Sequence, residues 1–411
     1  MKSALSPGKP ERQKGRGDPI RICFWTTTFQ ADVLTLARYL DNHPGFEPLV
    51  VLEDPESFRR EAIQELLPLS CPLMDRYGKN VFSRIRAFAP HITIVDNHFP
   101  PKKISPALYV QWHGFGWRGP NDRREFAAVH RHIRRLTGRG SDRSNPRFIW
   151  SCFGPTDLRH RRQVSGFHQD NLRVLGAPLT DDLMPPLIPR EQALSYYPPS
   201  FRSGKIALLA ITWHHGRIFA HWGDDGELMR RLFRELDRLG LAVIVRMHDR
   251  RRYEPGYLKF LGQMVKDYPA VLLKYKDQER DNLLDLTVSD VLISNFSSIL
   301  NPFYYTGRPS LHIYPVAPQQ EFFIQRTWKR GKVRERKVPS SDFIWKLDPE
   351  ENGGILARSF AQLLEAMETA VRDPDCCREK ARIFVQKHMA PSGGSICPRI
   401  AEVLSDLAEG V

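Results

Sequence analysis

The feature that most constrains the fold of this chain is a repeated alternation of short apolar runs with helical periods, which occurs in two blocks. Apolar runs of strand length followed by helical patterns favour a parallel sheet, because consecutive parallel strands need a crossover between them. A segment with five prolines, residues 183–204, separates the blocks and is predicted to be a linker with one short helix. The sequence therefore predicts an α/β protein of two Rossmann-like domains that face each other across a cleft, with C-terminal helices closing the chain.

The predicted boundaries follow from these patterns. We expect a disordered basic arm at 1–19, an N-terminal domain at 20–182, the linker at 183–204 and a C-terminal domain with its closing helices at 205–411. Strands are predicted at 20–26, 48–52, 91–95, 108–112 and 147–153, and then at 205–213, 241–247, 270–275, 290–294 and 309–314. Helices are predicted at 33–40, 62–67, 227–239, 257–268, 299–306, 357–371 and 377–388.

The charge balance indicates an anionic partner. Lys and Arg number 61 against 47 Asp and Glu, and this net charge of +14 suits nucleic acid, an acidic membrane face or a phosphorylated substrate. Nucleic acid is disfavoured, because no recognisable nucleic-acid module is present and the basic residues are spread through the chain. The six cysteines have neither zinc-ligand spacing nor a disulfide framework, no apolar stretch is long enough to span a bilayer, and no secretory signal is recognised. A protein of the reducing cytosol is expected.

Polar clusters follow several predicted strands, at the edge where open α/β sheets bind ligands. Trp112, His113 and Gly114 end the strand at 108–112. A histidine there can accept a proton from an attacking hydroxyl at neutral pH, or it can simply cap a turn or pack in the core. Gly114 also opens a formal G-x-G-x-x-G pattern, but the acidic residue of a dinucleotide-binding site is missing from its usual place about 20 positions later.

Two further clusters are typical of phosphate binding. Arg246 and His248 share one side of a strand end and are predicted to clamp a pyrophosphate, the alternative being a solvated basic loop. Ser297 and Ser298 follow another strand and precede a helical pattern, where free backbone N–H groups and hydroxyls make an anion site. One of these serines can equally be a plain helix N-cap.

These clusters resemble motifs of the CDP-glycerol glycerophosphotransferases, the teichoic-acid primases and polymerases. The matching elements are Trp112-His113-Gly114, Thr212-Trp213, Arg246-Met247-His248, Gly176-Ala177-Pro178 with Asp181, Asp290 to Ser298 with Gly307-Arg308-Pro309, and a fainter one from Gly394 to Arg399. They occur in the family's order and cover about residues 105–400. The chain departs from the family pattern at Phe115, Leu179, Asn295, Phe296 and Gly393.

The resemblance implies a GT-B fold and transfer of a glycerol-phosphate, or related polyol-phosphate, unit from a CDP-activated donor to a hydroxyl of a lipid-linked or glycan acceptor, with release of CMP. It implies His113 as the general base. Residues implied to bind the donor and its phosphates are Arg246, His248, Ser297, Ser298, Asn295 and Thr212, and those implied on the acceptor side are Trp112, Gly114 and Arg118. No cofactor and no protein-bound metal are expected, and any Mg²⁺ would arrive on the donor phosphates.

The same resemblance implies a cytoplasmic enzyme that is peripheral on the inner face of the cell membrane. Residues 118–143 carry eight arginines interspersed with apolar residues at near-helical spacing, so this stretch is a candidate contact for anionic lipid. Its alternative is an ordinary helix whose apolar side packs on the sheet. For the whole chain, the alternative function is a sugar-nucleotide enzyme of the same fold, either a polysaccharide glycosyltransferase or a UDP-sugar 2-epimerase.

Overall fold

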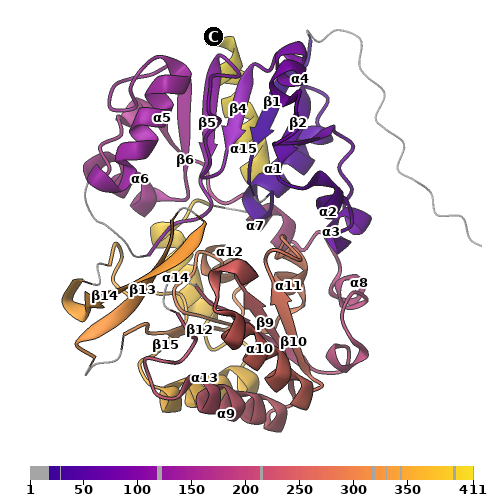
Figure 1. The fold of residues 1–411 in the computed structure, drawn as a ribbon, viewed down its shortest axis with the longest axis vertical. Helices are drawn as coiled ribbons and strands as arrows, with labels where there is room; N and C mark the ends of the chain where they lie inside the picture. The colour runs from indigo at the N-terminus through magenta and orange to yellow at the C-terminus, as the bar shows by residue number, and fades with distance from the viewer. Residues whose placement is uncertain are drawn as a thin grey trace, which may run out of the picture.

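The computed structural model describes residues 18–27, 29–117, 123–212, 216–316, 320–329, 331–342, 345–391 and 395–410. These residues form two parallel sheets, each covered by helices, one above the other in Figure 1. The arm predicted at 1–19 lies almost wholly outside the described residues, as do Arg118, Trp213, Gly393 and Gly394.

The N-terminal sheet has seven parallel strands in the order β3-β2-β1-β4-β5-β6-β7. Its strands are β1 (Ile20–Trp25), β2 (Phe46–Leu52), β3 (Leu73–Asp75), β4 (Ile92–Val95), β5 (Ala107–Gln111), β6 (Phe148–Cys152) and β7 (Leu172–Val174). The helices between them are α1 (Ala31–Asp41), α2 (Pro55–Arg59), α3 (Ala62–Leu66), α4 (Val81–Phe88), α5 (Ala127–Thr137), α6 (Pro155–Gln163) and α7 (Leu179–Leu183). Strands β4, β5 and β6 are buried along their whole length, as a sheet with helices on both faces requires.

The C-terminal sheet has six parallel strands in the order β10-β9-β8-β11-β12-β15. Its strands are β8 (Lys205–Ala210), β9 (Leu241–Met247), β10 (Val271–Tyr275), β11 (Val291–Ser294), β12 (Ser310–Ile313) and β15 (Ile355–Ala357). Its helices are α9 (Asp225–Arg238), α10 (Pro255–Met264), α11 (Leu283–Val288), α12 (Leu300–Tyr304), α13 (Phe360–Arg372) and α14 (Arg378–His388), and the short α8 (Arg190–Leu194) lies in the proline-rich segment.

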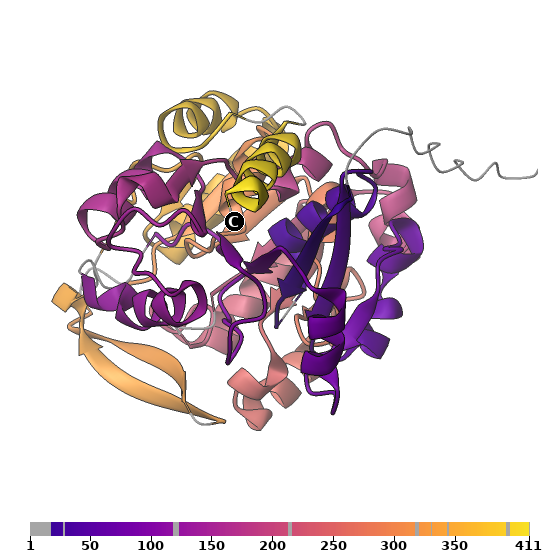
Figure 2. The ribbon, with the colours of Figure 1, turned by 90° about the horizontal axis from the view of Figure 1, so that it is seen from above.

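The predicted fold class is confirmed: the chain is α/β with two parallel sheets. Each predicted strand is present within about one to three residues of its predicted ends. The sequence patterns missed the short strands β3, β7 and β15. They also missed an antiparallel pair, β13 (Phe322–Lys329) and β14 (Lys332–Pro339), which lies at the edge of the molecule in both views (Figures 1 and 2).

The last helix corrects the predicted domain boundary. Helix α15 (Ile396–Glu409) does not stay with the C-terminal domain; its buried face shares one hydrophobic cluster with Ile92 of β4 and Tyr109 of β5. Its first two backbone N–H groups donate to the Asp181 carboxylate, at 3.2 and 2.7 Å. The chain therefore crosses back and ends against the N-terminal sheet (Figure 1).

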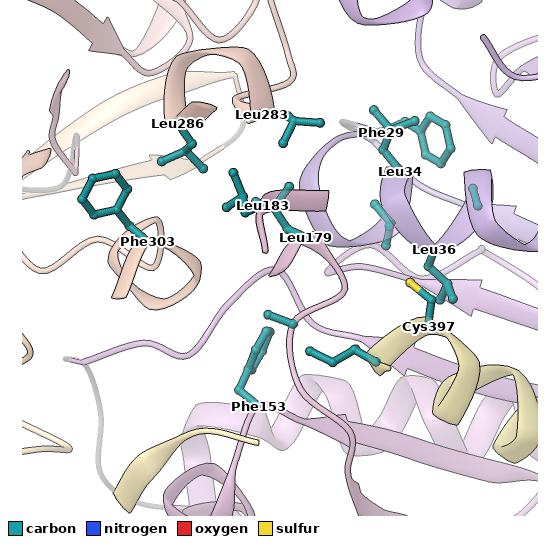
Figure 3. Packing of buried hydrophobic residues seen from close by; sticks show 14 of the residues in the cluster. Phe29, Leu34, Leu36, Phe153, Leu179, Leu183, Leu283, Leu286, Phe303 and Cys397 are labelled. Carbon is teal, nitrogen blue, oxygen red and sulfur yellow. The ribbon is translucent and has the colours of Figure 1, made fainter. Parts of the chain in front are cut away.

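The two domains share a continuous apolar contact around α7. In Figure 3, Leu179 and Leu183 of α7 lie between Leu283 of α11 and Leu34 of α1. Arg280, in the loop before α11, forms a buried ion pair with Glu61, with Nη1 and Oε1 2.6 Å apart. These contacts fix how the carboxyl ends of the two sheets face each other.

Candidate functional site

A cleft of about 510 Å³ lies between the carboxyl ends of the two sheets. Most of the predicted site residues line it, namely Trp112, His113, Gly114, Thr212, Arg246, His248, Ser297 and Ser298. Of the other two, Asn295 is buried and not part of the cleft wall, and Arg118 falls outside the described residues. Folding therefore brings together residues that are up to 186 positions apart in the chain, since 298 − 112 = 186.

His113 stands at the end of β5, where its side chain meets the solvent of the cleft. Desolvation by the surrounding protein lowers the pKa of His113 to about 4. The Asp96 carboxylate opposes this shift, whereas the positive charges of Lys276 and Arg161 reinforce it. His113 is neutral at pH 7, which is the form that can accept a proton.

Trp112 belongs to an aromatic cluster behind His113. Its ring stacks on Trp150 at 5.1 Å between centroids and meets the edge of Phe126 at 5.6 Å. The His113 ring lies 5.0 Å from the Trp112 ring. This packing fixes Trp112 in the N-terminal wall of the cleft, next to His113.

Gly114 and Ser298 bring the two walls of the cleft into contact. Gly114 has φ +137°, and a Cβ at this position would lie 2.3 Å from the Cβ of Ser298. The Ser298 hydroxyl points to the backbone oxygen of His113, 3.5 Å away. Only glycine allows this approach, because any other residue would overlap with Ser298 and adopt a backbone conformation that side chains disfavour.

The turn that presents the serines depends on Phe296. This residue has φ +64°, a conformation that a bulky residue adopts at a cost of about 1–2 kcal/mol. Asn295, just before it, accepts a hydrogen bond from the backbone N–H of Thr212 at 2.6 Å and so ties the end of β11 to that of β8. Asn295 is thus a positioning residue here.

Helix α12 spans five residues, so its dipole adds little to the anion site predicted at Ser297 and Ser298.

Arg246 does not match its predicted role as a direct phosphate ligand. Its side chain is 8% exposed and pairs with Asp285, while its Nη2 donates to the backbone oxygens of Glu279, Arg280 and Asp281 at 2.8 to 3.0 Å. These bonds hold the loop before α11 in place. We therefore assign Arg246 a positioning role at the floor of the cleft.

His248 lines the cleft as a neutral side chain. Burial lowers the pKa of His248 to about 4, although the nearby Asp249 carboxylate, which would stabilise the protonated ring, opposes the shift. The backbone N–H of Asp249 lies 2.8 Å from Nδ1 of His248, so Nδ1 is the acceptor and Nε2 carries the proton. As a neutral imidazole, His248 can donate a hydrogen bond from Nε2 to a phosphate oxygen, but it does not add a positive charge to the predicted pyrophosphate clamp.

Sequence reasoning missed several titratable residues that line the cleft, among them Lys276 and Asp32. Lys276 follows β10, and burial lowers the pKa of its amine to about 8, so it is largely charged at pH 7. Asp32, in the first turn of α1, has its pKa raised to about 7 by burial and by nearby Asp182, against the hydrogen bond from the Leu179 N–H. The strand-end rule that identified His113 would also have found Lys276, since 270–275 was predicted as a strand.

The motif Gly176-Ala177-Pro178 with Asp181 has a structural role. Gly176 has φ +103°, and a Cβ there would lie 2.9 Å from Ile396 of α15. Asp181 receives the first N–H groups of the same helix. These residues anchor the returning C-terminal helix to the N-terminal domain.

Within the described ranges, no group of three or more His, Cys, Asp and Glu side chains is arranged to hold a metal ion. In the same part of the chain, no helix is long and apolar enough to cross a membrane.

No protein-family model and no curated protein sequence matches the chain. Solved structures do match. A structure of the wall teichoic acid polymerase TagF aligns with a TM-score of 0.68 at 14% identity, over 95% of this chain and 90% of that one. A putative UDP-N-acetylglucosamine 2-epimerase from Listeria monocytogenes aligns with a TM-score of 0.54 at 12% identity, over 96% and 98% of the two chains. The S. aureus MnaA–UDP structure aligns with a TM-score of 0.53 at 12% identity, over 95% and 97%. The chain therefore has the GT-B fold of these enzymes, and the resemblance to the teichoic-acid polymerases inferred from its motifs is confirmed at the level of the fold.

Proposed function

We propose that this protein is a transferase that moves a glycerol-phosphate or related polyol-phosphate unit from a CDP-activated donor to a hydroxyl of a lipid-linked or cell-surface glycan acceptor. The observation that carries the proposal is the pairing of a neutral His113 on one wall of the cleft with Lys276, His248 and two serines on the other. The fold likeness to TagF, one of whose structures is of a histidine variant soaked with CDPG, supports it.

The reaction follows from this arrangement. The acceptor hydroxyl oxygen forms a bond to the β-phosphorus of the donor, and the bond from that phosphorus to the bridging oxygen breaks, so that CMP leaves with the bridging oxygen. The hydroxyl proton passes to the free imidazole nitrogen of His113. Lys276 offsets the charge of the pyrophosphate, while His248 and Ser298 donate hydrogen bonds to its oxygens. Any Mg²⁺ would come with the donor phosphates, and no step needs a metal held by the protein.

A donor screen tests the proposal. Purified protein is incubated with CDP-glycerol, CDP-ribitol and UDP-sugars, and the release of CMP is compared with that of UDP and UMP. Thermal shift with the same donors gives a second reading, because a ligand at about 100 times its Kd adds about 2.7 kcal/mol of stability. Release of CMP together with selective stabilisation by CDP donors is expected. UDP-sugar turnover with no response to any CDP donor would contradict the proposal.

Asp32 favours the alternative, a sugar-nucleotide enzyme of the same fold. A carboxyl whose pKa is raised to about 7 at a cleft wall is suited to act as a general base near neutral pH. The two functions differ in which residue is essential. In a phosphotransferase, Asp32→Asn retains most of the turnover and His113→Ala does not; in the alternative, Asp32→Asn is inactive on a UDP-sugar.

We further propose that the protein works at the inner face of the cell membrane. In α5, Ile133 and Leu136 are buried in the N-terminal core, whereas Arg131, Arg134 and Arg135 are exposed. Since the apolar side is already packed, contact with lipid would be electrostatic, at about 1 kcal/mol for each arginine near an anionic surface. Binding to liposomes should require anionic lipid, weaken as salt rises from about 0.1 to 0.5 M, and fall when these three arginines become Glu. Equal binding to neutral vesicles would contradict the idea.

A further inference from the structure

Arg161, on α6, is a buried cation in the wall of the cleft that none of the motifs includes. The residue is 2% exposed, and its Nε lies 2.9 Å from Oδ1 of Asp157 on the same helix. Its guanidinium carbon lies 4.3 Å from the centroid of the Phe126 ring and 5.3 Å from that of Trp150. The ion pair and the two rings hold the guanidinium in one orientation.

One arm of this guanidinium remains unused. Nη1 of Arg161 is buried and has no hydrogen-bond partner among the described residues. Buried polar groups are almost always paired, and a charged N–H is especially costly to leave unpaired, so a ligand is the natural partner for a donor at a cleft wall. Guanidinium N–H groups recognise phosphate and carboxylate oxygens.

The position of Arg161 identifies which part of the substrate it meets. It projects from α6 of the N-terminal domain, the domain that also carries His113. Lys276 and His248, which the proposed function assigns to the donor, come from the other domain. An anion at Arg161 therefore lies close to the attacking hydroxyl, on the acceptor side.

We propose that Arg161 binds a phosphate group of the acceptor, next to the hydroxyl that attacks the donor, and thereby selects phosphate-bearing acceptors over neutral ones. The proposal rests on the proposed function, because that function makes this wall the acceptor side. In this role Arg161 is a specificity-determining residue.

The test compares the binding of glycerol 3-phosphate with that of glycerol, by calorimetry, with CDP present at saturation to occupy the donor side. The wild-type protein should bind glycerol 3-phosphate about tenfold tighter or more, the ratio expected for a charge-assisted hydrogen bond. Octyl phosphate and octanol form a second pair of probes in which the phosphate is carried on an apolar chain. A preference confined to this second pair assigns the phosphate to the lipid end of the acceptor, and a preference in the first pair assigns it to the polyol end.

The variants separate recognition from folding. Arg161→Met alone would leave Asp157 buried without its partner, so it is combined with Asp157→Asn, which retains the acceptor for the Phe153 N–H. Arg161→Lys is the second variant: it keeps a cation beside Asp157 but lacks the free arm of the fork. The matched control is Arg162→Met, which removes the same charge from the next position, where the side chain is exposed.

The preference for phosphate should disappear in the double variant, decrease in Arg161→Lys and persist in Arg162→Met. Equal binding of charged and neutral probes by the wild-type protein would overturn the proposal, and so would a preference that survives in a folded double variant or is undiminished in Arg161→Lys. CMP release from CDP-glycerol is measured separately. A phosphate preference without CMP release would refute the proposed function and leave the anion site, whereas CMP release without a preference would refute the anion site alone.

Discussion

Replacing Gly114 by alanine should lower both the stability and the activity of the protein, because the two walls of the cleft are in contact at this residue. The new Cβ would lie 2.3 Å from the Cβ of Ser298, well inside the contact distance of two carbon atoms. Overpacking of this kind costs about 1–3 kcal/mol. The backbone at φ +137° adds about 1–3 kcal/mol for a residue with a side chain. Together they amount to about 2–6 kcal/mol, a large part of the 5–15 kcal/mol that stabilises a typical domain.

The two domains can relieve part of this overlap by moving apart, and that movement would lower activity. A displacement of about 1 Å between His113 and the donor side is enough to reduce turnover about a hundredfold. We therefore expect Gly114→Ala to lose both stability, measured by urea unfolding, and CMP release. Gly138→Ala is the matched control for backbone strain, since Gly138 has φ +79° and its Cβ would meet no atom within 4 Å.

Combining Gly114→Ala with Ser298→Gly separates crowding from strain. Without the Ser298 side chain, the Cα of residue 298 would lie 3.7 Å from the new Cβ, an ordinary contact. The double variant should regain the part of the stability that crowding removed, and stay below the single Ser298→Gly variant by the backbone strain alone. Wild-type stability and activity in Gly114→Ala would refute the reasoning, and so would a double variant no more stable than Gly114→Ala.

One rule predicted the fold and placed most of the candidate site residues at the cleft: parallel strands end at a common edge, and polar residues after those ends meet there. His113, Thr212, His248 and the two serines obey this rule. Arg246 and His248, which follow a period of two at the end of β9, both line the cleft. The sequence pattern could not show what Arg246 contacts, because Asp285 lies 39 positions away and reaches it only through the packing of α11.

The destination of α15 was equally beyond the sequence. No helix was predicted over this segment. Its apolar positions form one buried face in the structure, but they do not say which of the two domains covers that face. The packing of α15 depends on two residues of the predicted Gly-Ala-Pro motif region. Asp181 accepts hydrogen bonds from the start of the helix, and Gly176 leaves room for Ile396. Arg161 was missed for a related reason: within a basic stretch it looks like any other solvated arginine until the aromatic rings of two other segments cover it.

Three further variants test the roles assigned to the cleft residues. His113→Ala should reduce CMP release about 10²–10⁴-fold and leave donor affinity, measured by calorimetry, intact. The active form of His113 is the neutral imidazole, and its pKa is lowered. Activity of the wild-type enzyme should therefore persist well below pH 6.5 and fall only as the pH drops through that lowered value. Lys276→Met should weaken donor binding about tenfold or more. The KM of the wild-type enzyme should rise above about pH 8, where the amine of Lys276 loses its charge, and this rise should be absent in the variant. The control Lys259→Met, at an exposed position, should change neither property. Arg246→Met should destabilise the fold by about 3–5 kcal/mol, since it removes one partner of a buried ion pair. Donor affinity should fall only together with this loss of stability. Arg246 contacts the backbone carbonyl groups of 279–281, and thereby holds the loop in which Arg280 pairs with Glu61. Donor affinity that falls while urea unfolding is unchanged would contradict this, and would return Arg246 to the direct phosphate contact that the sequence first indicated.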